Sequence, residues 1–139
     1  IGSLLADGIG DTIRVSLTDD PIKEPGAAIE ILKALGMAGP HIEVVSCPTC
    51  ARCRIKLIDI AKEVNERTKG IPHNLKVAVM GCVVNGPGEA KDADIGIAGG
   101  DGCAVMFKKG EIVGKFKEDE VVDRLISEIQ EMIKMKGTD

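Results

Sequence analysis

The residues best suited to chemistry in this sequence are its cysteines, which gather in two runs rich in turn-forming residues. One run is Cys47-Pro-Thr-Cys50-Ala-Arg-Cys53, and the other is Gly81-Cys-Val-Val-Asn-Gly-Pro-Gly-Glu89, which contains Cys82. A two-residue spacer lets two thiolates bind one metal centre, because the loop turns back over it. Each run follows a predicted strand, so Cys47, Cys50 and Cys82 are expected to converge on one centre at a sheet edge.

Three kinds of centre fit these thiols. Zinc favours four Cys or His ligands and could take Cys53 as the fourth, although His41 and His73 are more typical of surface residues. A thioredoxin-like dithiol fits the Cys47–Cys50 pair between a strand and a helix, but it leaves the Cys82 loop unexplained. An iron–sulfur cluster accounts for both loops, because glycine-rich backbone can bring N–H groups close to sulfur.

The elements that must position these loops follow from the hydrophobic pattern after Gly39-Pro40. Alternation and β-branched residues predict strands, and apolar residues at helical spacing predict two helices. The order β-α-β-β-β-β-α indicates an α/β sandwich with a small mixed sheet. The predicted strands are 42–46, 75–80, 93–98 and 104–107, then a hairpin through Lys109-Gly110 into 112–113 and 115–116. The helices are marked by Leu57, Ile58, Ala61 and Val64, and by Val121, Val122, Leu125, Ile126, Ile129, Met132 and Ile133.

The first part of the chain predicts only one strand and one helix. Thr12–Leu17 alternates polar and apolar residues, and Ala28, Ile31, Leu32 and Leu35 form a helical stripe that ends at Gly36. One strand and one helix cannot bury both of their faces, so this segment is expected to need neighbours.

Composition excludes several functional classes. The 139 residues carry a formal net charge of −4, which gives no basic surface for nucleic acid. There is no Trp or Tyr and only two Phe, so stacking of bases on aromatic rings is not expected. No apolar run reaches the ~20 residues that span a bilayer. Residue 1 is Ile and no signal-peptide pattern follows, so we expect a trimmed chain from the cytoplasm, where clustered cysteines bind metal or do redox chemistry.

Four segments of the sequence are specific enough to resemble one family. They are Gly8-Ile-Gly-Asp-Thr-Ile-Arg-Val-Ser-Leu-Thr18, Ser46-Cys-Pro-Thr-Cys50, Val79-Met-Gly-Cys-Val-Val-Asn-Gly-Pro-Gly-Glu-Ala90 and Asp94-Ile-Gly-Ile-Ala-Gly-Gly100. Together they resemble the C-terminal part of the 4-hydroxy-3-methylbut-2-enyl diphosphate synthases, the iron–sulfur enzymes of the methylerythritol phosphate route to isoprenoids. The resemblance covers essentially the whole chain.

The resemblance implies a fold for each part of the chain. Enzymes of this family have an N-terminal TIM barrel and a C-terminal domain similar to the α/β cluster domain of sulfite and nitrite reductases. Residues 1–38 are then expected to be the last βα unit of the barrel, and residues 39–139 the iron–sulfur cluster domain. In the family the cluster domain of one subunit closes over the barrel of a second subunit.

The resemblance also implies roles for individual residues. Cys47, Cys50 and Cys82 would bind a 4Fe-4S cluster with Glu89 as the fourth ligand, a carboxylate that is harder and more labile than a thiolate. Arg14 and Ser16 match positions that hold the substrate diphosphate, and Asn85 matches a position close to the substrate. Ligation is not carried over to Cys53, Ala51 stands where the family commonly has Gly, and Cys103 is expected to be a strand residue without chemistry.

The implied activity is reduction of 2-C-methyl-D-erythritol 2,4-cyclodiphosphate to 4-hydroxy-3-methylbut-2-enyl diphosphate, with flavodoxin or ferredoxin as the electron donor. The chain is too short to contain the family's barrel, so we expect no catalysis by the chain alone. Two other functions remain open on the residues themselves: a stand-alone iron–sulfur electron-transfer module and a zinc-stabilised interaction domain.

Overall fold

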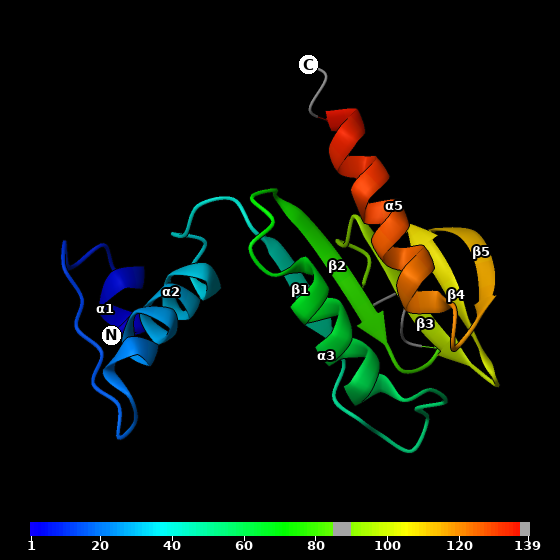
Figure 1. The fold of residues 1–139 in the computed structure, drawn as a ribbon, viewed down its shortest axis with the longest axis horizontal. Coiled ribbons are helices and arrows are strands. Elements are labelled where there is room, and N and C mark those ends of the chain that lie inside the picture. The colour runs from blue at the N-terminus through cyan, green and yellow to red at the C-terminus, as the bar shows by residue number, and fades with distance from the viewer. Residues whose placement is uncertain (85–89, 137–139) are drawn as a thin grey trace. The chain divides into compact units, whose positions relative to one another are not determined.

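Residues 1–84 and 90–136 are described by the computed structural model (Figure 1). Contacts between residues divide the chain into two units, Ile1–Pro40 and His41–Asp139. No helix in the described part of the chain is both long and apolar enough to cross a membrane.

The first unit consists of α1 (Gly2–Ala6), the 3-10 helix η1 (Pro21–Lys23) and α2 (Glu24–Ala34). The predicted helix is α2, which has a proline in its first turn and is followed by Gly36 with a φ of +66°. The predicted strand over Thr12–Leu17 is wrong, because these residues belong to no helix or strand. A strand needs a partner for its backbone hydrogen bonds, and this unit consists of helices and connecting segments.

The second unit is built on a five-stranded sheet formed by the described residues, in the order β1-β2-β3-β4-β5. The first three strands are parallel and the last two pairings are antiparallel, which confirms the predicted mixed sheet. The strands are β1 (Ile42–Ser46), β2 (Leu75–Met80), β3 (Ile95–Gly100), β4 (Cys103–Lys108) and β5 (Glu111–Lys117).

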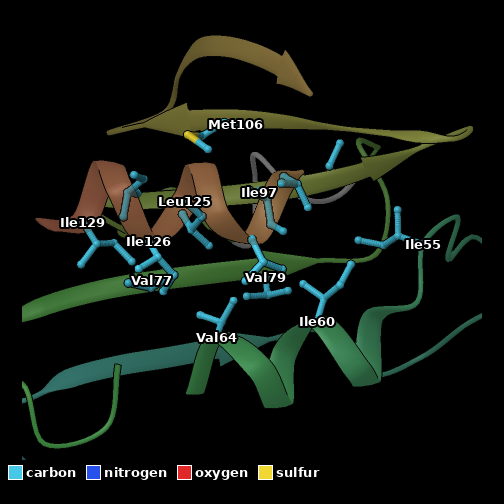
Figure 2. Packing of buried hydrophobic residues seen from close by; sticks show 14 of the residues in the cluster. Ile55, Ile60, Val64, Val77, Val79, Ile97, Met106, Leu125, Ile126 and Ile129 are labelled. Carbon is cyan, nitrogen blue, oxygen red and sulfur yellow. The ribbon is translucent and has the colours of Figure 1, made fainter. Parts of the chain in front are cut away.

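Two helices, α3 (Leu57–Thr68) and α5 (Val121–Lys136), pack on one face of this sheet (Figures 1 and 2). Alternate residues along the strands, such as Val77 and Ile97, point to this face and pack against the apolar stripes of the helices. Figure 2 shows Ile60 and Val64 reaching this core from α3, and Leu125, Ile126 and Ile129 reaching it from α5. Both predicted helices of this unit are therefore confirmed.

The opposite face of the sheet carries a smaller cluster made largely of alanines. Its members are Ala78, Met80, Ala90, Ala93, Ala98 and Phe107. A Cβ at Gly96 would lie 2.5 Å from Cζ of Phe107 and 2.7 Å from the carbonyl oxygen of Ala78. Glycine in β3 therefore makes room for one of the two phenylalanines of the chain.

A pair of hydrogen bonds and a tight turn fix where strands of the second unit begin and end. β3 begins two residues later than predicted, because Asp94 accepts a hydrogen bond from Lys76 N–H at its side chain and donates its own N–H to the Lys76 carbonyl, both at 2.9 Å. Between β4 and β5, Lys109 and Gly110 both have positive φ, of 49° and 83°. This is the conformation of a tight two-residue hairpin turn, as predicted.

The core on the helical face is expected to determine the stability of the second unit. Leu125 is fully buried on α5, and Leu125→Ala should lower the free energy of unfolding by about 2–5 kcal/mol. Met135 lies on the same helix with 78% of its surface exposed, so Met135→Ala should change the free energy of unfolding by less than about 0.5 kcal/mol. Urea titrations of the two variants test this, and equal losses would contradict the packing described.

Candidate metal centre

The cysteine-rich loops lie where the parallel strands of the sheet end. Cys47 directly follows β1, and Gly81 and Cys82 directly follow β2. The two strands are adjacent and parallel, with Ser46 opposite Val79, so their carboxyl ends meet at one edge. The convergence of the two loops that the sequence predicts is therefore present in the fold.

A hydrogen bond from backbone to sulfur joins the two loops. The N–H of Gly81 donates to Sγ of Cys47 at 3.3 Å. Cys47 is half-buried and packs against both hydrophobic clusters, and Cys82 is buried, with 8% of its surface exposed. This hydrogen bond places the Cys47 sulfur beside the first residue that follows β2.

Cys50 is the exposed thiol of the group. Its loop is closed by the N–H of Cys53, which donates to the carbonyl of Cys50 at 3.0 Å. The pKa of the Cys50 thiol is lowered from its ordinary value, chiefly because the backbone N–H of Arg52 donates to the sulfur. Desolvation opposes this shift in the pKa, and the Arg52 guanidinium supports it. A lowered pKa increases the thiolate fraction, and the thiolate is the form that binds metal.

Glu89, the predicted fourth ligand, and Asn85, which is predicted to lie close to the substrate, fall outside the described residues. Within residues 1–84 and 90–136, no three His, Cys, Asp or Glu side chains lie close enough together to hold a single metal ion. Cysteine thiolates from loops that share a sheet edge are the donor set that iron–sulfur clusters use.

The histidines lie away from this edge. His41 immediately precedes β1 and His73 comes just before β2, so both are near the amino ends of parallel strands whose carboxyl ends carry the cysteines. The two histidines therefore lie at the opposite ends of these strands from the cysteines.

Cys53 and Cys103 differ from the three predicted ligands. The Cys53 thiol is half-buried, donates to the carbonyl of Ile55 at 3.2 Å and packs against the main core. Cys103 is the first residue of β4, as predicted for a strand residue, and pairs with Gly100.

Arg14 and Ser16 belong to the first unit, where both are exposed. They lie two residues apart, with the half-buried Val15 between them. Their predicted contact with a diphosphate remains a prediction.

The sequence pointed to close approach of glycine-rich backbone but not to the particular contacts that Gly81 and Gly99 make. The carbonyl of Gly81 accepts the N–H of Arg54 at 2.9 Å, and a Cβ at Gly99 would lie 2.6 Å from that same carbonyl oxygen. The available signal was the placement of Gly81 and Gly99 at the ends of neighbouring strands, where backbone can approach backbone closely.

A surface pocket of about 490 Å³ lies elsewhere, between the amino ends of α3 and α5. Its charged lining is mostly acidic and includes Asp59, Glu63 and Glu118. None of the cysteines lines this pocket, so its volume does not bear on the metal centre.

Fold and site together define a mixed α/β domain that carries thiols at the carboxyl ends of its parallel strands. A family model described as the GcpE protein C-terminal domain matches residues 43–131, and the chain belongs to this family. The resemblance inferred from the motifs is thereby confirmed.

Relatives named 4-hydroxy-3-methylbut-2-en-1-yl diphosphate synthase (flavodoxin) align with almost all of the chain. The protein of Clostridium tetani is 62% identical over 130 residues, which are 94% of this chain and 37% of the relative. That of Geobacter sulfurreducens is 57% identical over 136 residues, 98% of this chain and 38% of the relative. That of Aquifex aeolicus is 55% identical over 138 residues, which are 99% of this chain and 39% of the relative. The chain therefore spans less than two fifths of the length of these relatives.

The lowered pKa of Cys50 is testable in the reduced, metal-free chain. Its alkylation by iodoacetamide should reach half-maximal rate at a lower pH in the native chain than in urea, because the Arg52 N–H is held near the sulfur only in the fold. Arg52→Gln should keep most of the difference, since the backbone N–H is the main cause. Peptide mapping by mass spectrometry gives the rates, and identical midpoints in native and unfolded chain would contradict the assignment.

Proposed function

We propose that this chain is the cluster-bearing C-terminal part of a reductive synthase that converts 2-C-methyl-D-erythritol 2,4-cyclodiphosphate to 4-hydroxy-3-methylbut-2-enyl diphosphate. The observation that carries the proposal is the hydrogen bond from Gly81 N–H to Cys47 Sγ. It joins the two cysteine loops at one sheet edge, in a chain that belongs to the GcpE C-terminal family.

The ligands of the proposed centre are Cys47, Cys50 and Cys82. Cys47 and Cys82 are anchored by packing at neighbouring strand ends, and Cys50 supplies an exposed thiol with a lowered pKa. Glu89 is proposed as the fourth ligand, because its harder carboxylate would hold iron less firmly than a thiolate. A bound 4Fe-4S cluster would pass electrons from the electron donor to the cyclic diphosphate.

The remaining proposed roles concern substrate and partners. Arg14 suits a diphosphate, because its planar guanidinium can pair with two phosphate oxygens, and Ser16 and Asn85 would add polar contacts. We propose that residues 1–38 complete a TIM barrel. The burial of only one large apolar side chain, Leu5, in the fully described unit Ile1–Pro40 supports this proposal.

Several partners follow from the same proposal. The barrel of a second subunit would cover the cluster domain, as the family implies. Flavodoxin is in the name of the relatives and is proposed as the electron donor, with ferredoxin as the other candidate. A cytoplasmic location would keep the thiols reduced. The chain by itself is expected to show no turnover of the cyclic diphosphate, because most of a barrel would be missing.

Metal analysis after anaerobic reconstitution tests the proposal. The chain should bind about four irons and four sulfides, the content of a 4Fe-4S cluster. Cys82→Ser should lose most of this iron, because it removes a ligand. Cys103→Ser is the matched control at the same sheet edge and should retain it. One zinc per chain without iron or sulfide would contradict the proposal and favour a zinc-stabilised domain.

A further inference from the structure

Cys53 is the last residue of the first cysteine run, and its sulfur lies beside Gly81, the first residue of the second run. Its N–H donates to the carbonyl of Cys50, and its thiol donates to the carbonyl of Ile55 at 3.2 Å. The side chain also packs against the core cluster that contains Ile55 and Leu57, both of which are buried. Figure 2 labels Ile55 among these packed residues. The sulfur of Cys53 is thus already engaged within the protein.

The Cys53 thiol fills space beside Gly81. A Cβ at Gly81 would lie 2.8 Å from Sγ of Cys53 and 3.3 Å from both Cβ of Cys53 and Cδ2 of Leu57. Gly81 has no positive φ, so alanine is compatible with the backbone conformation at this position. The requirement for glycine at 81 is therefore one of space, and the Cys53 sulfur is the nearest atom that imposes it.

Gly99 approaches the carbonyl group of Gly81. A Cβ at Gly99 would lie 2.6 Å from the carbonyl oxygen of Gly81 and 2.8 Å from Cγ1 of Ile55. That carbonyl is also held by Arg54 N–H at 2.9 Å. Gly81, the residue before Cys82, is consequently fixed by contacts from the Cys50 loop and from β3.

We propose that Cys53 is a positioning residue and not a metal ligand: its thiol packs on Gly81 and sets where the Cys50 loop and Cys82 lie relative to each other. The ligand part of this inference rests on the proposed function. To reach a cluster the Cys53 sulfur would have to give up both the Ile55 carbonyl and its packing against the core.

Thiol reactivity in the metal-free chain tests the packing contact. Gly81→Ala should speed alkylation of the buried Cys82 about tenfold, because the added methyl overpacks the junction. Cys53→Ala should speed it about threefold, because it leaves a gap. In the double variant the methyl group added at position 81 occupies the space left by the sulfur, so the rate should return to within about threefold of the original chain.

Gly99→Ala is the matched control, with the same added methyl at the neighbouring strand end. Gly99→Ala should also speed alkylation of Cys82. Adding Cys53→Ala to Gly99→Ala should not bring the rate back down, because the added methyl group meets atoms of Gly81 and Ile55 and none of Cys53. The proposal would be overturned if Cys53→Ala and Gly81→Ala multiplied each other's effects on the alkylation rate of Cys82. It would also be overturned if Cys53→Ala lowered the rate of Gly99→Ala as much as that of Gly81→Ala. Circular dichroism of each variant shows whether the sheet is retained.

Iron content after anaerobic reconstitution tests the second part. Cys53→Ala should retain most of the iron and the absorption spectrum of the original chain, whereas Cys50→Ala should lose both. Loss of iron from Cys53→Ala to the level of Cys50→Ala would make Cys53 a ligand and overturn the proposal. If the original chain takes up no iron, the proposed function fails, and the alkylation rates still decide whether Cys53 packs on Gly81 to protect Cys82.

Discussion

The carbonyl oxygen of Gly81 accepts the N–H of Arg54 at 2.9 Å and lies so close to Gly99 that a methyl group added there would come within 2.6 Å of it. This contact ties the end of β2 to the loop before α3 and to the end of β3. A backbone polar group in a buried junction must keep its partner, because leaving it unpaired costs about 1–3 kcal/mol. The two cysteine loops therefore cannot separate without losing this bond and the packing around it.

The sheet supplies the platform that makes such a junction possible. Three parallel strands end side by side, and both helices cover one face, which leaves that edge to loops. The composition of the chain suits this arrangement. With 17 glycines and only two phenylalanines, backbone segments approach one another at Gly81, Gly96 and Gly99 where larger side chains would prevent contact. The positions of the thiols thus depend on the close packing that these glycines allow.

Much of this architecture could be predicted from local sequence patterns. The periodicity of Leu75–Met80 and of Val121 to Ile133 identified a buried strand and an amphipathic helix, and the strand-end rule brought the Cys47 and Cys82 loops together. The prediction of a strand at Thr12–Leu17 is wrong because it depends only on the alternation of polar and apolar residues. Such alternation does not indicate whether a partner strand is present.

The finer features depend on contacts between distant residues. The start of β3 is determined by the hydrogen bonds between Asp94 and Lys76. The packing of Cys53 depends on Gly81, which is 28 residues further along the chain. Spacing alone presents Cys53 as one more thiol in a regular run of cysteines. Only the fold shows that its sulfur donates to Ile55 and packs inward. Asn85 and Glu89 lie outside the described residues, so their roles still rest on the motif.

The central claim is that the edge formed by β1 and β2 binds an iron–sulfur cluster through Cys47, Cys50 and Cys82. A crystal structure of the anaerobically reconstituted chain, with anomalous diffraction at the iron edge, tests it most directly. We predict iron bonded to these three sulfurs, with the Cys53 thiol still against Gly81. Zinc at this edge, or iron held by Cys53 in place of one of the three, would contradict the claim.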